Sequence, residues 1–461
     1  MRVTLIYPRF KYSNMGGLFV PLGILYIASV LRKDGHKVAL VDMTFQNNFD
    51  AIKNIVPDTD ILGISATTPL ASKAYQVLKL VKEMNPRLPC VLGGAHATVF
   101  PREALEYGFD VVVIGEGEVT ITDLVSAFEK GTSLDEVDGI ALRKGDQIKF
   151  TKPRAPINDL DELPFPAWDL INWEHYFKGG TPLPIIASRG CPYNCLFCQP
   201  IQTKMFGRKL RRRTSTNVVD EIIKITENLK RDSFFFSDDT FTTDREWVKR
   251  FCDELKTRSV NVHWQCQARV DTVDKETLKS MKNAGCSGIT FGVESGSQRI
   301  LNFLCKETEV ERTINTFKLC HKAGINANAY IIIGTPTENR NDLDLTVNLI
   351  RKIKPGIVCI SRLTPTPGSR LYDHLKEDEI YNIKNWHDFD YYANGYPLKL
   401  DYLTEEDLET YTRKILAEVA RINVTKRISK ALTTPWKTIP KFFKYPKEAI
   451  LLMKEALGYE S

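Results

Sequence analysis

The sequence contains no run of about 18 apolar residues, so we expect no membrane-spanning helix. Its first residues, MRVTLIYPRF, lack the basic region, long apolar core and small-residue cleavage site of a signal peptide, and they are typical of a β-strand. The excess of positive over negative charge is also small. A net charge of +6 over 461 residues does not by itself imply nucleic-acid binding. These absences predict a cytoplasmic protein, and the length of 461 residues predicts two or three domains.

A disulfide framework is not expected either, because the ten cysteines occur in a chain without an export signal. Three of them, Cys191, Cys195 and Cys198, lie close together in the sequence. This distribution predicts one metal site and a set of core thiols. The other seven cysteines are scattered singly: Cys90, Cys252, Cys266, Cys286, Cys305, Cys320 and Cys359.

Residues 1–150 alternate short apolar runs with helical patterns, which predicts an α/β domain with a doubly wound, flavodoxin-like parallel sheet. The expected strands are Val3–Tyr7, Val38–Val41, Ile61–Ser65, Cys90–Leu92 and Val111–Ile114. Ligands of such sheets bind at the carboxyl ends of the strands. The candidate ligand-binding residues at those ends are Ser65, Thr67, Gly93, Gly94, His96, Gly115, Glu116 and Gly117.

A second βα series is expected in residues 184–375, after a proline-rich linker at 151–183. Its regular units predict a curved parallel sheet, a partial (β/α)6 barrel with its chemistry on the carboxyl-end loops. The expected strands are Pro184–Ala187, Ser233–Ser237, Asn261–Cys266, Gly288–Val293, Ala329–Ile333 and Ile357–Ser361.

The three clustered cysteines follow the first strand of this second series directly. Three thiolates in the spacing C-x₃-C-x₂-C can wrap one face of a cubane, and thiolates are the ligands of iron–sulfur clusters. Three protein ligands leave one iron open for chemistry. The alternatives are three unrelated thiols or a zinc site, which normally needs a fourth protein ligand that is not obvious nearby. We therefore expect an open-site [4Fe–4S] cluster.

This motif, with Phe197 just before its last cysteine, resembles that of the radical S-adenosylmethionine (SAM) superfamily. The resemblance implies that SAM chelates the open iron and that the reduced cluster splits SAM into methionine and a 5′-deoxyadenosyl radical. That radical abstracts hydrogen from an unactivated C–H bond. The resemblance also implies Phe197 as a SAM contact, an oxygen-labile cluster and an electron donor such as flavodoxin or ferredoxin.

The resemblance implies further SAM-binding residues where the barrel strands end. Asp238 matches the second-strand acid of the family, although Asp238 or Asp239 could instead finish a turn. Arg269 could clamp the SAM carboxylate or pair with a neighbouring acid. Glu294 matches the fourth-strand acid, with a helix-capping role as the alternative. Gly334 lies in a segment that resembles the adenine-side motif, with a plain core strand as the alternative.

The doubly wound domain in front of this barrel resembles that of the cobalamin-binding class of radical SAM enzymes, and the linker segment LDELPFP at 160–166 fits that class. The resemblance covers roughly residues 1–375 and implies that the candidate residues of the first domain bind cobalamin. One departure is the absence of the D-x-H-x-x-G motif, whose histidine binds cobalt from below. His96 is a candidate near the corrin, with a turn histidine bonded to backbone as the alternative.

Residues 376–461 are expected to form a helical C-terminal extension, with Thr404 as a helix N-cap. Residues 425–461 contain eight Lys or Arg and three Glu, a net charge of +5, with aromatic residues between them. Such a stretch suits peripheral contact with the anionic inner face of a membrane. The alternatives are a helix packed on the barrel with a solvated basic face and, less favoured, an RNA-binding stretch.

These features predict a cobalamin-dependent radical SAM enzyme that methylates an unactivated carbon of a small-molecule or lipid substrate. No nucleic-acid partner is expected. One alternative is an oxidoreductase or cyclase that resembles the anaerobic Mg-protoporphyrin ester cyclase and transfers no methyl group. Another is a non-catalytic cluster and corrinoid protein that acts as a sensor or carrier. The substrate is not readable, because specificity depends on loops and extensions.

Overall fold

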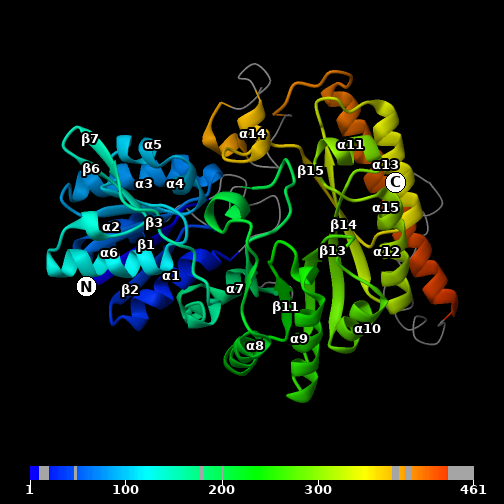
Figure 1. The fold of residues 1–461 in the computed structure, drawn as a ribbon, viewed down its shortest axis with the longest axis horizontal. Coiled ribbons are helices and arrows are strands. Elements are labelled where there is room, and N and C mark those ends of the chain that lie inside the picture. The colour runs from blue at the N-terminus through cyan, green and yellow to red at the C-terminus, as the bar shows by residue number, and fades with distance from the viewer. Residues whose placement is uncertain are drawn as a thin grey trace.

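The computed structural model describes residues 1–9, 20–45, 49–176, 181–199, 201–375, 384–389 and 397–433, with only the backbone for 202–203 and 426–433. The described chain forms two large β-sheets, each covered by helices, at the two ends of an elongated molecule (Figure 1). A parallel α/β domain precedes a half-barrel of parallel strands, and a helix follows it. The predicted fold class is confirmed.

The first sheet has the strand order β2-β1-β3-β4-β5-β6-β7, in which the first five strands are parallel. This order of the parallel strands is that of flavodoxin-like sheets. The antiparallel β6 and β7 were not predicted, because the exposed polar residues of this hairpin hide its alternation. The strands are β1 (Arg2–Tyr7), β2 (Lys37–Asp42), β3 (Ile61–Ser65), β4 (Cys90–Gly93), β5 (Val111–Val113), β6 (Ile140–Lys144) and β7 (Gln147–Phe150).

Helices cover both faces of this sheet, and a separate apolar core lies under each face. Helices α1 (Leu22–Lys33) and α6 (Glu118–Lys130) pack over one face. The other face carries α2 (Phe49–Ile55), α3 (Ala71–Met84) and α5 (Pro101–Glu106), and the short α4 (Ala95–Val99) follows β4. Strands buried on both faces explain the continuous apolar runs in the sequence.

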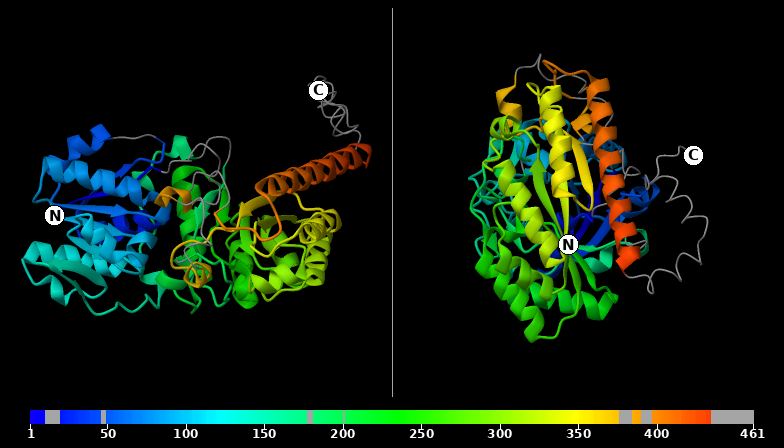
Figure 2. Two further views of the ribbon diagram at one scale, coloured as in Figure 1. Left: turned by 90° about the horizontal axis from the view of Figure 1, so that it is seen from above. Right: turned by 90° about the vertical axis from the view of Figure 1, so that its right-hand side faces the viewer.

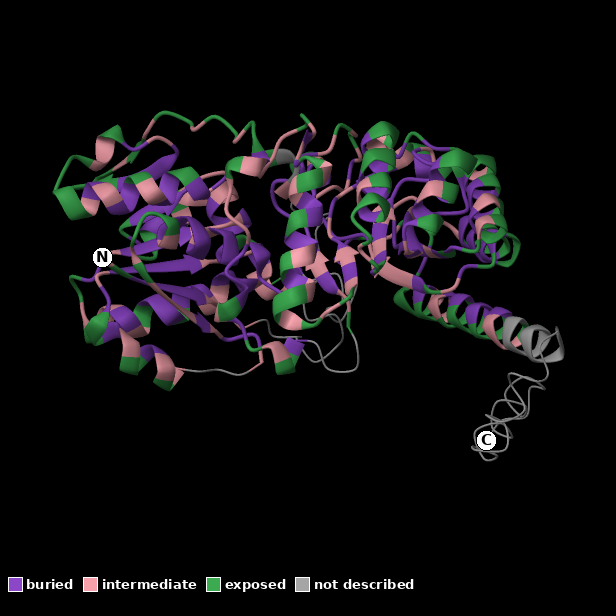
Figure 3. Ribbon diagram, turned by 90° about the horizontal axis from the view of Figure 1, so that it is seen from below, coloured by how far each residue is buried: buried purple, intermediate pink, exposed green. Residues whose placement is uncertain are grey.

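The second sheet contains six parallel strands in the order β15-β14-β13-β12-β11-β8, as the sequence predicts. The strands are β8 (Leu183–Ile185), β11 (Ser233–Phe236), β12 (His263–Ala268), β13 (Cys286–Glu294), β14 (Asn326–Ile333) and β15 (Val358–Arg362). The helices that follow them are α8 (Ser215–Leu229), α9 (Arg245–Thr257), α10 (Lys275–Asn283), α11 (Gln298–Phe303), α12 (Val310–Ala323) and α13 (Arg340–Ile353). Buried residues run through both sheets, and exposed residues concentrate on the helices (Figure 3).

A short antiparallel pair, β9 (Ser188–Arg189) and β10 (Arg211–Arg212), follows β8. The predicted cluster loop lies between these two strands. The single-turn π-helix η7 (Ile201–Met205) lies on the same excursion. The two ends of the excursion are therefore held together beside the mouth of the barrel.

The proline-rich linker packs between the two sheets rather than running free. Ser29 of α1 donates a hydrogen bond to the Phe165 carbonyl at 2.6 Å. The Tyr176 hydroxyl donates to Asp42 at the end of β2, also at 2.6 Å. Trp168 joins the apolar core of the half-barrel. The linker thus contacts both sheets and helps to hold them together.

The C-terminal part returns along the half-barrel. The short helices α14 (Arg370–His374) and η10 (Trp386–Phe389) precede the long helix α15 (Glu405–Thr433). The predicted cap is present, because the Thr404 hydroxyl accepts a hydrogen bond from Asp407 N at 3.2 Å and the Asp407 carboxylate accepts one from Thr404 N at 3.0 Å. Helix α15 packs against α13 and then extends away from the molecule (Figure 2).

Most of the segment 425–461, for which membrane contact is predicted, lies in residues 434–461, outside the described residues, and only the backbone of 426–433 is described. In the part that is described, no helix is long and apolar enough to cross a bilayer.

Two neighbouring residues of α15 provide a test of this packing. Ile415 is fully buried against the half-barrel, whereas Leu416 is 49% exposed. We expect Ile415→Ala to lower the free energy of unfolding by about 2–5 kcal/mol, because it leaves a cavity in the core. Leu416→Ala should change it by less than about 0.5 kcal/mol. Denaturant midpoints of the two variants measure the difference, and equal midpoints would contradict this docking of α15.

Candidate functional site

Two cavities lie at the carboxyl ends of the strands. The first, the interdomain cavity, has a volume of about 390 Å³ and lies between the two sheets. The second, the barrel cavity, has a volume of about 410 Å³ and lies at the mouth of the half-barrel. Ser237 and Asp239, just after β11, line both cavities. The two cavities therefore adjoin at these two residues.

Most of the residues predicted to bind cobalamin line the interdomain cavity. They are Ser65, Thr67, Gly93, Gly94, Gly115, Glu116 and Gly117. Gly94 has a second reason to be glycine, since its φ is +96° and a Cβ would lie 2.7 Å from the Ala66 carbonyl oxygen. The turn itself therefore requires this glycine. The opposite wall comes from the half-barrel and its hairpin, through Ile186, Ser188, Arg189, Ile201, Met205, Phe206, Ser237 and Asp239.

His96 does not line either cavity, so its predicted place beside the corrin is not supported. Its side chain is fully buried, and its Nε2 lies 2.8 Å from the Tyr75 hydroxyl. Tyr75 in turn donates to Glu103 at 3.0 Å, and the ring of Trp386 lies against the imidazole. Burial lowers the pKa of His96 to about 4, so the ring is neutral near pH 7. His96 belongs to a polar network between α3, α4, α5 and η10.

Glu116 lines the interdomain cavity, but its carboxylate is held by arginines of the half-barrel. Its Oε1 lies 3.3 Å from Arg189, and its Oε2 lies 2.8 Å from Arg211. Glu118 binds the other terminal nitrogen of Arg189 at 2.5 Å. All four side chains are buried. The segment predicted from its glycines to hold a ligand therefore also joins the two domains.

The three cysteines of the motif all line the barrel cavity. Backbone bonds hold their loop, because Leu196 N donates to the Leu304 carbonyl and the Leu196 carbonyl accepts from Leu371 N, both at 2.9 Å. Burial raises the pKa of each thiol, that of Cys198 to about 12. Because metal ligands must be thiolates, iron binding has to displace these protons.

Within the described ranges, no three His, Cys, Asp or Glu side chains converge on a position for a single metal ion. A cubane cluster does not require such a point, since each thiolate binds a different iron atom. Three thiols along the wall of one cavity are therefore compatible with a cluster and less so with a single zinc ion.

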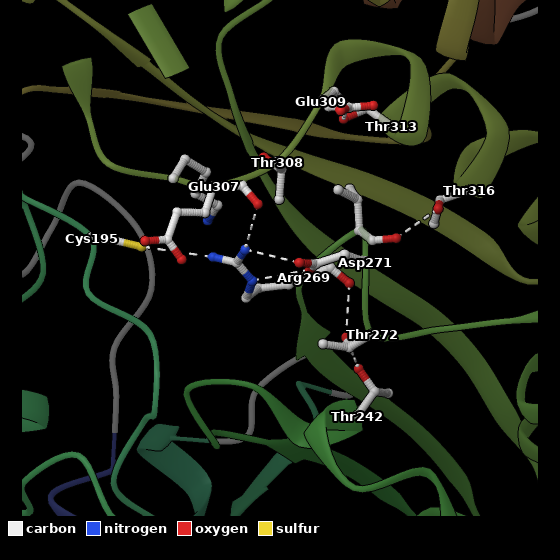
Figure 4. Close-up of polar contacts among 12 residues, drawn as sticks. Cys195, Thr242, Arg269, Asp271, Thr272, Glu307, Thr308, Glu309, Thr313 and Thr316 are labelled. Atoms are coloured by element: carbon white, nitrogen blue, oxygen red, sulfur yellow. Dashed lines mark hydrogen bonds and ion pairs between the residues drawn. The ribbon is translucent and has the colours of Figure 1, made fainter. Parts of the chain in front are cut away.

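Arg269 lies against the cluster loop and pairs with a neighbouring acid (Figure 4). Its guanidinium binds both oxygens of Asp271, at 3.0 and 2.9 Å, and its Nη1 lies 3.8 Å from Cys195 Sγ. The Tyr193 ring stacks on it, with 3.7 Å from the guanidinium carbon to the ring centroid. The ion pair with a neighbouring acid, one of the two roles considered for Arg269, is present. The Arg269 side chain also lines the barrel cavity, where the other role, binding of the SAM carboxylate, would take place.

Glu294 lines the barrel cavity and is paired with a lysine that the sequence analysis did not identify. Lys306 Nζ lies 2.7 Å from Glu294 Oε1, and both side chains are buried. Burial opposes the charge on Lys306, but Glu294 and Cys195 nevertheless keep its pKa above the ordinary value. Glu294 has a φ of +61° at a break in the β13–β14 register. Such strain in a non-glycine residue is typical of functional sites.

Asp238, the predicted SAM ligand, lines neither cavity, and its carboxylate is bound by the fold, so a contact with SAM stays a prediction. Its carboxylate is 1% exposed, accepts a hydrogen bond from Ala187 N at 3.0 Å and binds the Ser188 hydroxyl. The next residue, Asp239, lines both cavities. The strand alternation explains the difference, because Phe234, Phe236 and Asp238 point to the same packed side. That parity was readable in the sequence.

Gly334 also lies outside the linings of both cavities. Its amide donates to the Glu338 carboxylate at 2.8 Å, as part of the turn after β14. Burial raises the pKa of Glu338 to about 7. Phe197 does line the barrel cavity, as predicted. Further residues in this lining that were not predicted include Tyr193, Gln267, Tyr330, Cys359, Arg362 and Thr364.

Comparison with known proteins agrees with both parts of the chain. Residues 185–350 match the radical SAM superfamily, and residues 12–125 match the B12 binding domain. An uncharacterized methyltransferase of Pyrococcus horikoshii is 32% identical over 425 residues, which cover 90% of this chain and 91% of that protein. The anaerobic magnesium-protoporphyrin IX monomethyl ester cyclase of Rubrivivax gelatinosus is 31% identical over 405 residues, which cover 84% of this chain and 72% of that protein.

A solved structure has the same fold across both domains. The radical SAM methyltransferase TsrM of Kitasatospora setae, with cobalamin and a [4Fe–4S] cluster bound, superimposes with a TM-score of 0.71 at 14% identity. The match covers 90% of this chain and 88% of that one. Together with the sequence relatives, this shows that the chain belongs to the radical SAM superfamily, in the class with an N-terminal B12-binding domain.

Proposed function

We propose that this enzyme binds a [4Fe–4S] cluster, SAM and cobalamin and that it methylates an unactivated carbon. The observation that carries this proposal is the junction of the two cavities at Ser237 and Asp239. A methyl donor in the interdomain cavity and a hydrogen-abstracting group in the barrel cavity could both reach a carbon held at that junction. The methyltransferase relative from Pyrococcus horikoshii supports the same reaction type.

The side chains of the barrel cavity fit a cluster and SAM. Cys191, Cys195 and Cys198 supply three thiols and leave a fourth iron position without a protein ligand. The buried Lys306 ammonium lies near Cys195, where the carboxylate of a chelated amino acid would need a cation. Glu294 balances that charge and could accept hydrogen bonds from SAM. We therefore assign Lys306 to the SAM site.

The interdomain cavity offers mostly apolar, glycine-rich walls against which the flat face of a large cofactor such as a corrin could lie. Its walls are formed by glycines and apolar side chains at the ends of β3, β4 and β5, with hydroxyl groups from Ser65 and Thr67. This composition is typical of a cofactor site at the switch point of a parallel sheet. None of the residues that line this cavity is a histidine, so we assign no side chain as a cobalt ligand.

When bound, these groups supply a 5′-deoxyadenosyl radical from SAM on one side and a methyl group from methylcobalamin on the other. The residues of this chain hold the substrate between them and exclude water. Asp239 and Ser237 present a carboxylate and a hydroxyl at the junction, where they can orient a hydroxyl or amino group of the substrate. The partners required are this small-molecule or lipid substrate and an electron donor such as flavodoxin or ferredoxin.

An oxidative cyclase is the second candidate, and one observation favours it. The cyclase of Rubrivivax gelatinosus is almost as similar to this chain as the methyltransferase relative. The same cavities would serve hydrogen abstraction without methyl transfer. Neither the described residues nor the relatives support membrane contact through residues 425–461.

The cluster assignment predicts the effect of removing its ligands. Replacement of Cys191, Cys195 and Cys198 together by alanine should abolish iron and sulfide binding and 5′-deoxyadenosine formation, because no thiolates remain to hold the cluster. Cys90→Ala, in the other domain, should retain both. Iron and sulfide analysis of anaerobic protein, followed by a SAM cleavage assay with dithionite, provides the measurement. Cleavage that survives the triple replacement would overturn the assignment, and a pure sensor or carrier would give none in the wild type.

The neighbouring aspartates should respond differently to the same change. Asp239→Asn should retain iron and cobalamin and slow 5′-deoxyadenosine formation by about tenfold or more, the equivalent of one hydrogen bond to a charged group. Asp238→Asn should instead lower the thermal stability, because the buried carboxylate accepts bonds from Ala187 and Ser188. Cofactor content, turnover and melting temperature are measured for both variants. The reverse pattern would indicate Asp238 as the functional acid.

Product mass separates the two reaction types. Comparative metabolomics of a deletion strain, lipids included, should identify a compound that the purified enzyme converts. A gain of one methyl group supports the methyltransferase, and a loss of hydrogen without that gain supports the cyclase. Hydroxocobalamin should remain with the protein through gel filtration, visible by its absorption. Protein that elutes without this band would refute cobalamin binding.

A further inference from the structure

The buried charges between the two domains lie next to the cluster motif. Arg189 is separated from Cys191 by the single residue Gly190. Both carboxylates that bind Arg189 come from the first domain, Glu116 from the loop after β5 and Glu118 from the first turn of α6. Each of these three side chains is at least nine-tenths buried. A movement of the first domain would therefore move Arg189, which lies two residues before the cluster ligand Cys191.

The connection between Arg189 and Cys191 has little freedom. Gly190 has a φ of +86°, and a Cβ at this position would lie 2.4 Å from the Lys209 carbonyl oxygen. The next amide, Cys191 N, donates to the Gly207 carbonyl at 3.3 Å. A movement of Arg189 would therefore move the backbone of Cys191 rather than be absorbed between them.

The same arginine also faces the interdomain cavity. Its guanidinium lies between the rings of Tyr26 and Phe206, at 5.5 and 5.1 Å from their centroids. Tyr26, Phe206, Arg189 and both glutamates line that cavity. By contrast, no residue from Cys191 to Cys198 lines it. A ligand in the interdomain cavity can thus act on the cluster loop through this group of residues, as well as through Ser237 and Asp239 at the junction of the two cavities.

A second arginine fixes the other side of the hairpin. Arg211 binds Glu116 at 2.8 Å, the Ile157 carbonyl at 2.5 Å and the Phe206 carbonyl at 3.0 Å. The Glu116 carboxylate also accepts from Ile157 N at 2.7 Å. The two arginines and two glutamates form a neutral set, and removal of one member leaves a buried charge without its partner.

We propose that Glu116 and Glu118 are positioning residues for the cluster, so that cobalamin binding in the first domain orders the cluster loop of the second. This coupling works in both directions, because an effect of one site on the affinity of another must be reciprocal. It rests on the proposed function only in requiring that the interdomain cavity binds cobalamin. In this role Glu116 and Glu118 do not need to contact cobalamin or the cluster themselves, because their carboxylates act through Arg189.

Hydrogen exchange of the full-length, iron-loaded protein tests the coupling. In the wild type, hydroxocobalamin should slow amide exchange in a peptide that covers Cys191–Cys198 as well as in the strand-end segments 93–97 and 113–117. In Glu118→Gln, the protection at 93–97 should remain and most of the protection at Cys191–Cys198 should be lost. Glu118→Asp, which retains the charge, should restore much of it. Glu129→Gln, at the exposed end of the same helix, should behave as the wild type.

Two outcomes would overturn this role. One is equal cobalamin-dependent protection of the cluster loop in the wild type and Glu118→Gln. The other is the absence of such protection in a wild-type protein that retains cobalamin. A wild type that does not retain cobalamin contradicts the proposed function instead, which the gel-filtration step reveals before exchange is measured. If Glu118→Gln does not load both cofactors, Glu118→Asp decides, because a positioning carboxylate predicts partial loss of cluster-loop protection and a purely structural one predicts equal loss at every segment.

Discussion

The buried pairing of Arg189 with Glu116 and Glu118 is the interaction on which the arrangement of this site depends. Each sheet presents its strand ends to a cavity, and the two cavities adjoin because the sheets face each other. The two sheets must face each other at a set distance, and apolar packing is poorly suited to fix it, because it is not directional. Paired buried charges are directional, and a displaced partner is costly.

Much of the fold could be predicted because each strand carries its own signal. The apolar runs between helical patterns gave both parallel sheets, since strands buried on both faces need no polar alternation. The β6–β7 hairpin was missed because its one apolar run, residues 140–142, is short, and the rest of the hairpin is mostly exposed. The cysteine motif was equally local, with three ligands within one loop. Structural features that depend only on neighbouring residues could therefore be predicted from the sequence.

The features of the site that the sequence did not reveal have a different origin, since they concern residues whose surroundings are set by distant partners. Lys306 pairs with Glu294 across a strained bulge, and nothing in its neighbours marks it as buried. His96 follows two glycines at a strand end, which suggests a ligand, but Tyr75 of α3 holds it within the domain. Glu116 lines the interdomain cavity, and its carboxylate is in addition engaged by arginines 73 and 95 residues away, which no local pattern reveals.

Strand parity distinguishes Asp238 from Asp239 and shows how far local reasoning reaches. Asp238 continues the buried side of β11, on which Phe234 and Phe236 lie, and a carboxylate on that side has to be satisfied by backbone or hydroxyl donors. Asp239 therefore falls on the open side, where the two cavities adjoin. Of these two adjacent acids, one is buried in the fold and the other lines the cavities. The alternation of the strand decides which, because successive side chains point to opposite faces.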